Sequence, residues 1–425
     1  LGTQSTQMVT DNQTEDDYTY KSDYSSTTEL LDSIEDLGER MSEEGTVLLK
    51  NNGALPLSAD EKKKVTFLGF SSYFPVQGGD FGSTLAENKG TDADTVDMVQ
   101  AFEAKGYSLN PTVQQMYEGM KEDFKSEAVL PWGVVTYYRA TAPAVGGTFT
   151  SLEPSQEKLD KAEPTWKDSM NDYNVMIVTI ARAAGENANY TPGEEGVNPE
   201  QNLNQADPLG LSDTERATID AAVKAKAENG GKVIVLLNNA SAMEIDELKN
   251  NDGIDAMLEV GIPGGYGFYG VADVLSGDAN PSGHLADTYA VDNSASPAAQ
   301  NYGDYEWTNA DSDYSINSEI VEAESIYAGY KYYETRYADT VLGQGNASDS
   351  VGSSTGGAWT YNSEVSYPFG YGLSYTTFTQ TLDSLNVDLE NKTVTAEVTV
   401  TNTGDVAGKD VVQLYASTPY TDYDK

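Results

Sequence analysis

The chain has 425 residues and a formal net charge of −43, with 68 acidic residues against 25 Lys and Arg residues. So negative a surface repels phosphate groups, which argues against nucleic-acid binding and against contact with anionic membranes. One His and no Cys exclude disulfides and thiol chemistry and disfavour a zinc site, so we expect neither a metal nor a cofactor.

The first part of the chain is predicted to be a flexible arm followed by a helix. Residues 1–25 are polar and acidic, as disordered segments are. Between 27 and 43 the apolar residues recur at helical spacing. They are Leu30, Leu31, Ile34, Leu37 and Met41. The chain begins at Leu1 rather than Met, which is the pattern that a cleaved export signal would leave.

Residues 64–70 form a strongly apolar run and predict the first clear buried strand. A glycine-rich stretch, QGGDFGST (77–84), follows this strand. Glycine-rich turns can bind phosphate, but this one lacks the Lys of a P-loop and the spacing of the dinucleotide fingerprint. We therefore expect its backbone to approach a neighbouring domain or a ligand closely.

Helical and strand patterns alternate from residue 93 to residue 276. Helices are predicted at 93–105, 112–124, 154–170, 212–229, 240–250 and 264–276, and strands at 175–181, 232–238 and 254–260. The strands are continuous apolar runs, which is typical of strands buried on both faces of a sheet. This pattern predicts a doubly wound α/β sandwich domain, to which we assign residues 26–340.

The longest stretch without periodicity follows the strand at 175–181. It ends where Ser212 opens a helix, with Glu215 three residues later in a capping box. Long loops inside compact domains are usually functional, and open α/β sheets bind ligands at the carboxyl ends of their strands. We therefore expect the functional site here, and the stretch carries Glu186, Glu194 and Glu195.

The last third of the chain changes character twice. The aromatic run at 327–337 is interpreted as a packed strand rather than a sugar platform, and the Gly- and Ser-rich residues 341–365 as a linker. From 366 to 425 the apolar residues alternate with polar ones, as in Val394, Ala396, Val398 and Val400, and 411–414 continues a strand. This predicts the first strands of an antiparallel sandwich, which is incomplete because such sandwiches need roughly seven strands.

Five strings, in fixed order along the chain, are similar to those of glycoside hydrolase family 3, the β-glucosidase and β-xylosidase family. They are EGTVLLKNNGALPL (44–57), GGDFGS (78–83), VLSGDANPSGHL (274–285), YPFGYGLSYTTF (367–378) and NTGDVAG (402–408). The resemblance implies an α/β sandwich domain followed by the N-terminal part of a fibronectin-III-like domain. This is the family's permuted order, in which its (β/α)8 barrel comes last.

The resemblance also implies a partner for this chain. The family carries its Asp nucleophile on the barrel, so we expect a second polypeptide segment that brings the barrel and completes the fibronectin-like domain. The polar residues 416–425 are where we expect a cut between the two segments. A homo-oligomer is a further expectation that the sequence leaves open.

The resemblance implies that Glu186, which follows Gly185 just beyond a buried strand, is the general acid/base. A retaining glycosidase needs two carboxyl groups about 5 to 5.5 Å apart, one as nucleophile and one as acid/base. Glu194 and Glu195 remain alternatives for the acid/base, and a solvated loop glutamate remains the alternative reading of Glu186.

Four other residues are expected at the substrate: Tyr190 in the leaving-group subsite, Asp80 and Phe81 from the glycine-rich stretch, and Arg182. Arg182 could instead orient Glu186 or form a surface ion pair. In the family, an Asp-Arg pair often follows the acid/base Glu. This chain has other residues after Glu186, so no residue here is assigned the substrate contacts of the family's Arg.

We therefore expect part of a retaining β-glycosidase that hydrolyses β-glucosides such as cello-oligosaccharides and aryl glucosides. A β-xylosidase of the same family and a non-catalytic carbohydrate-binding or scaffold chain are the alternatives. The sequence holds no run of eighteen apolar residues that could span a bilayer. We expect an extracellular or cell-surface location in a bacterium, with a cytoplasmic location as the alternative.

Overall fold

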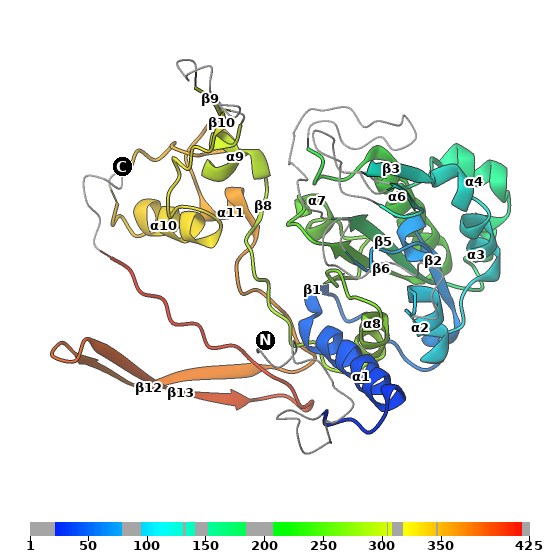
Figure 1. Cartoon of the computed structure of the whole chain (residues 1–425), viewed down its shortest axis with the longest axis horizontal. Helices are drawn as coiled ribbons and strands as arrows, with labels where there is room; N and C mark the ends of the chain where they lie inside the picture. Colours follow the sequence, from blue (N-terminus) through cyan, green and yellow to red (C-terminus); the bar gives the residue numbers. More distant parts are fainter. Residues whose placement is uncertain are drawn as a thin grey trace, which may run out of the picture.

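The computed structural model describes residues 22–78, 95–130, 133–140, 152–183, 207–303, 305–307, 318–345 and 347–418. A five-stranded sheet with the order β1-β7-β6-β5-β2 forms the centre of the larger domain (Figure 1). Strands β2 (Val65–Leu68), β5 (Val175–Arg182), β6 (Lys232–Asn239) and β7 (Ala256–Glu259) run parallel, and β1 (Val47–Asn51) is antiparallel to β7. The predicted α/β class is confirmed, with strand boundaries within two residues of the expected ones.

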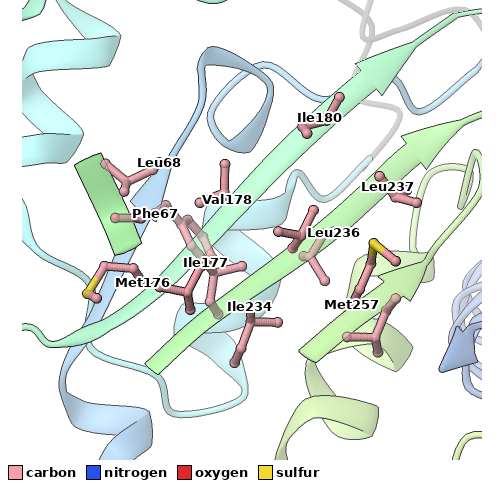
Figure 2. Close-up of a cluster of buried hydrophobic side chains, with 14 of the residues drawn as sticks. Phe67, Leu68, Met176, Ile177, Val178, Ile180, Ile234, Leu236, Leu237 and Met257 are labelled. Atoms are coloured by element: carbon pink, nitrogen blue, oxygen red, sulfur yellow. The ribbon is translucent and has the colours of Figure 1, made fainter. Parts of the chain in front are cut away.

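The sheet is held by continuous apolar strands. Every residue of β2, β5 and β7 is buried, so both faces of these strands are covered. Phe67, Ile177, Leu236 and Met257 lie in one core that crosses four neighbouring strands (Figure 2). Burial of a side chain of this size contributes about 1.5–3 kcal/mol. The strands are therefore held in their register by the side chains that they bury.

The helices of this domain follow the expected order. The first is two residues longer than expected, the others are shorter, and the one helix expected at 154–170 is two. The helices are α1 (Thr27–Gly45), α2 (Met98–Ala104), α3 (Pro111–Glu118), α4 (Gln156–Ala162), α5 (Trp166–Ser169), α6 (Asp213–Asn229), α7 (Asp246–Lys249) and α8 (Gly267–Ser276). A short antiparallel pair, β3 (Ser126–Leu130) with β4 (Gly133–Tyr137), was not expected. Among the described helices, none combines the length and apolar character that a membrane span requires.

A second, smaller unit forms between residues 285 and 367. Its elements are β8 (Tyr289–Ala290), α9 (Pro297–Asn301), β9 (Tyr305–Glu306), β10 (Ser318–Glu319), α10 (Tyr330–Thr340), α11 (Tyr361–Glu364) and β11 (Val365–Tyr367). Tyr332, Tyr333 and Trp359 share its small apolar core. The strand expected in the run 327–337 is therefore wrong, since most of this run is α10. The stretch 341–365, expected as a linker, contributes Trp359 and α11 to the packed unit.

The last described part is a long hairpin that projects away from the sheet (Figure 1). Strands β12 (Phe378–Asp388) and β13 (Thr393–Asn402) pair antiparallel along their whole length. The expected alternation in β13 is confirmed, and the hairpin has one apolar and one polar face. The strand expected at 411–414 is wrong, because residues 403–418 contain no strand.

Candidate functional site

Polar side chains gather at the carboxyl ends of the three central parallel strands. Arg182 at the end of β5 pairs in register with Asn239 at the end of β6, and Glu259 ends β7 beside them. All three residues are buried. The carboxyl edge of an open α/β sheet is where such folds bind their ligands, so this edge is the candidate site.

Arg182 stabilises the carboxyl edge of the sheet through five hydrogen bonds. Its Nη1 and Nη2 atoms donate to the two carboxylate oxygens of Glu215 over 2.7 and 2.9 Å. Nη1 also donates to the Ala181 carbonyl, Nη2 to the Gly210 carbonyl and Nε to the Pro208 carbonyl. These five contacts use all five N–H groups of the guanidinium, and the side chain is 0% exposed.

This arrangement differs from what the sequence suggested for Arg182. A contact with substrate was expected, with orientation of Glu186 or a surface ion pair as alternatives, but the guanidinium is buried and every N–H is donated to a described protein atom. The pair instead joins the end of β5 to the first turn of α6. Because Ala183 and Asp207 are the described residues that flank segment 184–206, Arg182 holds the two roots of that segment together.

A second set of contacts holds the roots of segment 79–94. The Val76 N–H donates to the Asn238 Oδ1, and Asn238 Nδ2 donates to the carbonyls of Val76 and Gly261. Gln77 Nε2 donates to the carbonyls of Val96 and Gly264 over 2.8 and 3.3 Å. Asn238 lies at the carboxyl end of β6, so the glycine-rich stretch begins at the same edge as segment 184–206.

Glu259 is the buried acid of this edge. The Tyr289 hydroxyl and the Gly261 N–H each donate to one of its carboxylate oxygens over 2.8 Å. Burial raises the pKa of Glu259 to about 8, although both hydrogen bonds act in the opposite direction. The carboxyl is therefore protonated at neutral pH, which is the form that a proton donor needs.

A hollow of about 400 Å³ lies above Glu259. Its polar lining comes from the end of α1, the carboxyl ends of β6 and β7, and the residues before β8. The polar side chains are Ser42, Thr46, Asn239, Ser241, Glu259, His284, Asp287 and Tyr289. Their mixture of donors and acceptors suits a neutral, polar occupant. The hollow is connected to the end of β5, because the N–H of its lining residue Ala240 donates to the Arg182 carbonyl.

One group of carboxylates has the spacing of a metal site. It consists of Glu39, Glu43 and Asp273, at the contact of α1 with α8. The Lys105 ammonium donates to Asp273 over 2.7 Å and to Glu39 over 3.0 Å. The Lys105 ammonium therefore already pairs with this cluster, which forms an ionic contact between elements of the fold.

Of the site residues predicted from the sequence, the structure describes only Arg182. Glu186, Tyr190, Asp80 and Phe81 lie outside the described residues, as do the alternatives Glu194 and Glu195. Sequence reasoning missed Glu259, Asn238 and Gln77. A signal existed for Glu259, because a carboxylate that ends an apolar strand is costly to bury without a role or a partner.

The chain resembles known proteins over most of its length. The model of the Glycosyl hydrolase family 3 C-terminal domain matches residues 46–375. A β-glucosidase of Ruminococcus albus is 28% identical over 380 residues, which cover 88% of this chain and 31% of that protein. Beta-glucosidase A of Butyrivibrio fibrisolvens is 34% identical over 211 residues, or 46% of this chain and 21% of that protein.

Solved structures agree with these matches. β-Glucosidase 3B of Thermotoga neapolitana, in complex with α-D-glucose, superposes with a TM-score of 0.60 at 26% identity. The superposition covers 89% of this chain and 43% of that protein. The chain thus spans between about a fifth and less than half of the length of these relatives.

Loss of the Arg182 guanidinium should unfold the edge. We expect Arg182→Ala to lower the free energy of unfolding by about 3–5 kcal/mol, because it leaves the Glu215 carboxylate buried without its partner. The matched control is Arg216→Ala, which removes the half-exposed pair with Glu247 and should cost at most about 1 kcal/mol. Urea unfolding measures both, and equal losses in the two variants would contradict this role of Arg182.

Protonated Glu259 should make stability depend on pH. The pKa of Glu259 in the folded protein, about 8, is above the ordinary value of 4.5, so the unfolded chain loses this proton first as pH rises. The stabilisation is complete below about pH 4.5 and disappears as pH rises towards about 8, with a slope of up to about 1.4 kcal/mol per pH unit for one proton.

Glu259→Gln should therefore lose less stability than the parent chain between about pH 5 and about pH 8 in urea unfolding. The control Glu228→Gln changes an exposed acid and should keep the parent slope. A parent-like slope in Glu259→Gln would show that the carboxyl is ionised in the folded state.

Proposed function

This chain belongs to glycosyl hydrolase family 3, and we propose that it supplies the general acid/base of a retaining β-glucosidase. In this proposal Glu186 is the acid/base, and a partner segment with a (β/α)8 barrel supplies the Asp nucleophile. The substrates are β-glucosides, including cello-oligosaccharides and aryl glucosides.

The observation that supports this role best is the fastening of segment 184–206 at the carboxyl edge of the sheet. Glu186 follows Arg182 by four residues, and Arg182 is the residue that the buried pair with Glu215 fixes. An acid/base must be held against the substrate while the rest of its segment forms the subsite. A segment that begins at the end of β5 and returns at the start of α6, with the two joined by the Arg182–Glu215 pair, meets that requirement.

The chemistry needs one carboxyl group in two protonation states. Glu186 first donates a proton to the glycosidic oxygen while the nucleophile attacks the anomeric carbon and the leaving group departs. The ionised Glu186 then removes a proton from the water that hydrolyses the glycosyl-enzyme, which returns Glu186 to its acid form. The family's barrel must bring the nucleophile to about 5–5.5 Å from Glu186 for this sequence to work.

Support for glucosides as substrates comes from the relatives. The matching proteins of Ruminococcus albus and Butyrivibrio fibrisolvens are β-glucosidases, and the Thermotoga neapolitana enzyme was solved with glucose. None of these three relatives is named as a xylosidase. We therefore assign glucose to the subsite on the non-reducing side of the cleaved bond.

The β12–β13 hairpin supports a partner segment. Its cross-strand pairs Leu382–Val398, Leu385–Ala396 and Val387–Val394 all lie on one face, opposite a face of Thr, Asn and Glu residues. Five apolar side chains of that face are 41% to 58% exposed: Leu382, Leu385, Val387, Val394 and Val400. Two-stranded sheets are marginal in water, so we propose that further strands of the partner segment cover this face as a fibronectin-III-like sandwich.

Glu186→Ala in the complete enzyme should separate substrates by their leaving groups. Hydrolysis of cellobiose should fall by about 10²–10⁴-fold, since its leaving group needs a proton, while activated aryl glucosides should lose far less. Azide should restore turnover of the aryl glucosides by entering the space of the lost carboxyl. Glu194→Ala and Glu195→Ala serve as controls and should hydrolyse cellobiose almost as the parent does. Parent-like hydrolysis of cellobiose by Glu186→Ala would overturn the assignment.

The chain separated from its partner segment should show no glucosidase turnover, because the nucleophile is then missing. Aryl glucoside hydrolysis by the purified chain measures this. The Glu186→Ala chain is the control for a contaminating enzyme, since turnover shared by both chains does not come from this site. Turnover by the isolated parent chain that Glu186→Ala abolishes would contradict the division of the active site between two segments.

A further inference from the structure

Helix α1 presents a row of apolar side chains to solvent. The residues are spaced at helical intervals on one face and are Leu30, Leu31, Ile34, Leu37 and Met41, exposed by between 38% and 66%. We call this set the α1 stripe. Single exposed apolar residues are ordinary, but a contiguous row of five large ones marks an interaction surface.

The face of α1 away from the stripe is already packed, so α1 cannot rotate to bury the stripe against the sheet. This face packs against α8 at two glycines, where a Cβ on Gly267 would meet Ser42 and a Cβ on Gly270 would meet the backbone of Glu39 (Figure 1). Lys105 adds an ionic link by donating to both Glu39 and Asp273 of α8. So close a contact fixes the rotation of α1, and a side chain of the stripe cannot turn towards the sheet without breaking it.

We propose that the α1 stripe is the docking surface for the barrel-bearing partner segment. This inference rests on the proposed function, which requires such a segment, and adds the place where it binds. The occupant has an apolar patch flanked by basic side chains, because α1 carries seven acidic residues against one Arg, and Glu29, Asp32 and Asp36 are exposed on it.

Charge argues against a second copy of this chain as the occupant. Two copies would bring the exposed acidic residues of one α1 against those of the other, within chains that each carry a net charge of −43. The N-terminal residues 1–21 are also a poor match for the stripe. They contain four acidic residues and only three aliphatic ones, which are Leu1, Met8 and Val9.

Continuity with the candidate site favours the barrel. Met41 ends the stripe and lines the hollow above Glu259, together with Ser42 and Gly45 of the same helix. A partner seated on the stripe therefore reaches the carboxyl edge of the sheet. It would stand beside the roots of segment 184–206, which is where a nucleophile has to be brought if Glu186 is to act with it.

The absence of Cys from this chain allows a direct test. Ile34→Cys places one thiol in the stripe, and Ile320→Cys places one at an 89% exposed apolar position outside it. Maleimide labelling of each variant is followed in the isolated chain and in the complete enzyme, with the unsubstituted chain as the baseline for thiols of the partner. We expect the thiol of Ile34→Cys to react at least about tenfold more slowly in the complete enzyme, and that of Ile320→Cys to react equally in both.

Three results would overturn the docking surface. One is equal labelling of Ile34→Cys in the isolated chain and the complete enzyme. Another is protection in the isolated chain that depends on its concentration, which would indicate self-association. The third is concentration-independent protection in the isolated chain, which would indicate coverage by its own residues. Failure here leaves the proposed function standing if Glu186→Ala still loses cellobiose hydrolysis, so the two proposals are separately falsifiable.

Ile34→Asp provides a second readout that does not depend on labelling. The substitution should leave the unfolding of the isolated chain unchanged, because the side chain is already exposed. Titration with the partner segment should show weaker binding by the Ile34→Asp chain than by the Ile320→Asp control, although the β12–β13 hairpin still contributes to binding in both. Equal affinity of the two variants for the partner segment would contradict the proposal.

Discussion

The buried ion pair between Arg182 and Glu215 is the constraint on which the candidate site depends. A guanidinium with no exposure is tolerated only when every N–H has an acceptor, and here two carboxylate oxygens and three carbonyls supply them. Glu215 also accepts from the Ser212 N–H, so the carboxylate that caps α6 is the one that binds Arg182. The end of β5 and the start of α6 therefore form one rigid unit, and segment 184–206 leaves and returns at that unit.

The same physical solution recurs along the edge. Asn238 and Gln77 use side-chain amides to hold the roots of segment 79–94, and burial favours the protonated form of Glu259, which has no ion partner. Asn238 and Glu259 lie at the carboxyl ends of apolar strands, where the burial of a polar side chain is costly without hydrogen bonds. Together they make the carboxyl edge rigid and polar, while the α1 stripe and the apolar face of β12–β13 remain open to a partner.

The sequence was sufficient for the sheet and insufficient for the contacts that define the site. Strands such as Val175–Arg182 could be predicted because continuous apolar runs identify strands buried on both faces. The run 327–337 was misassigned because Tyr residues suit both strands and helices and their spacing fits both periods. The pairing of Arg182 with Glu215, and of Glu259 with Tyr289, joins residues about thirty apart. Such pairing is set by the packed fold, so local pattern could not reveal it. Residues 411–414 are mostly apolar, with two β-branched Val residues, but such a run becomes a strand only when it pairs with another strand.

We propose that this chain and a barrel segment each contribute one carboxyl group to a single active site. A structure of the complete enzyme with a bound glucoside analogue tests it most directly, through the distance between the carboxyl groups of Glu186 and the nucleophilic Asp. We expect about 5–5.5 Å between these carboxyl groups across the anomeric carbon, as a retaining mechanism requires. A separation of about 6.5 Å or more, or another acid in the place of Glu186, would contradict it.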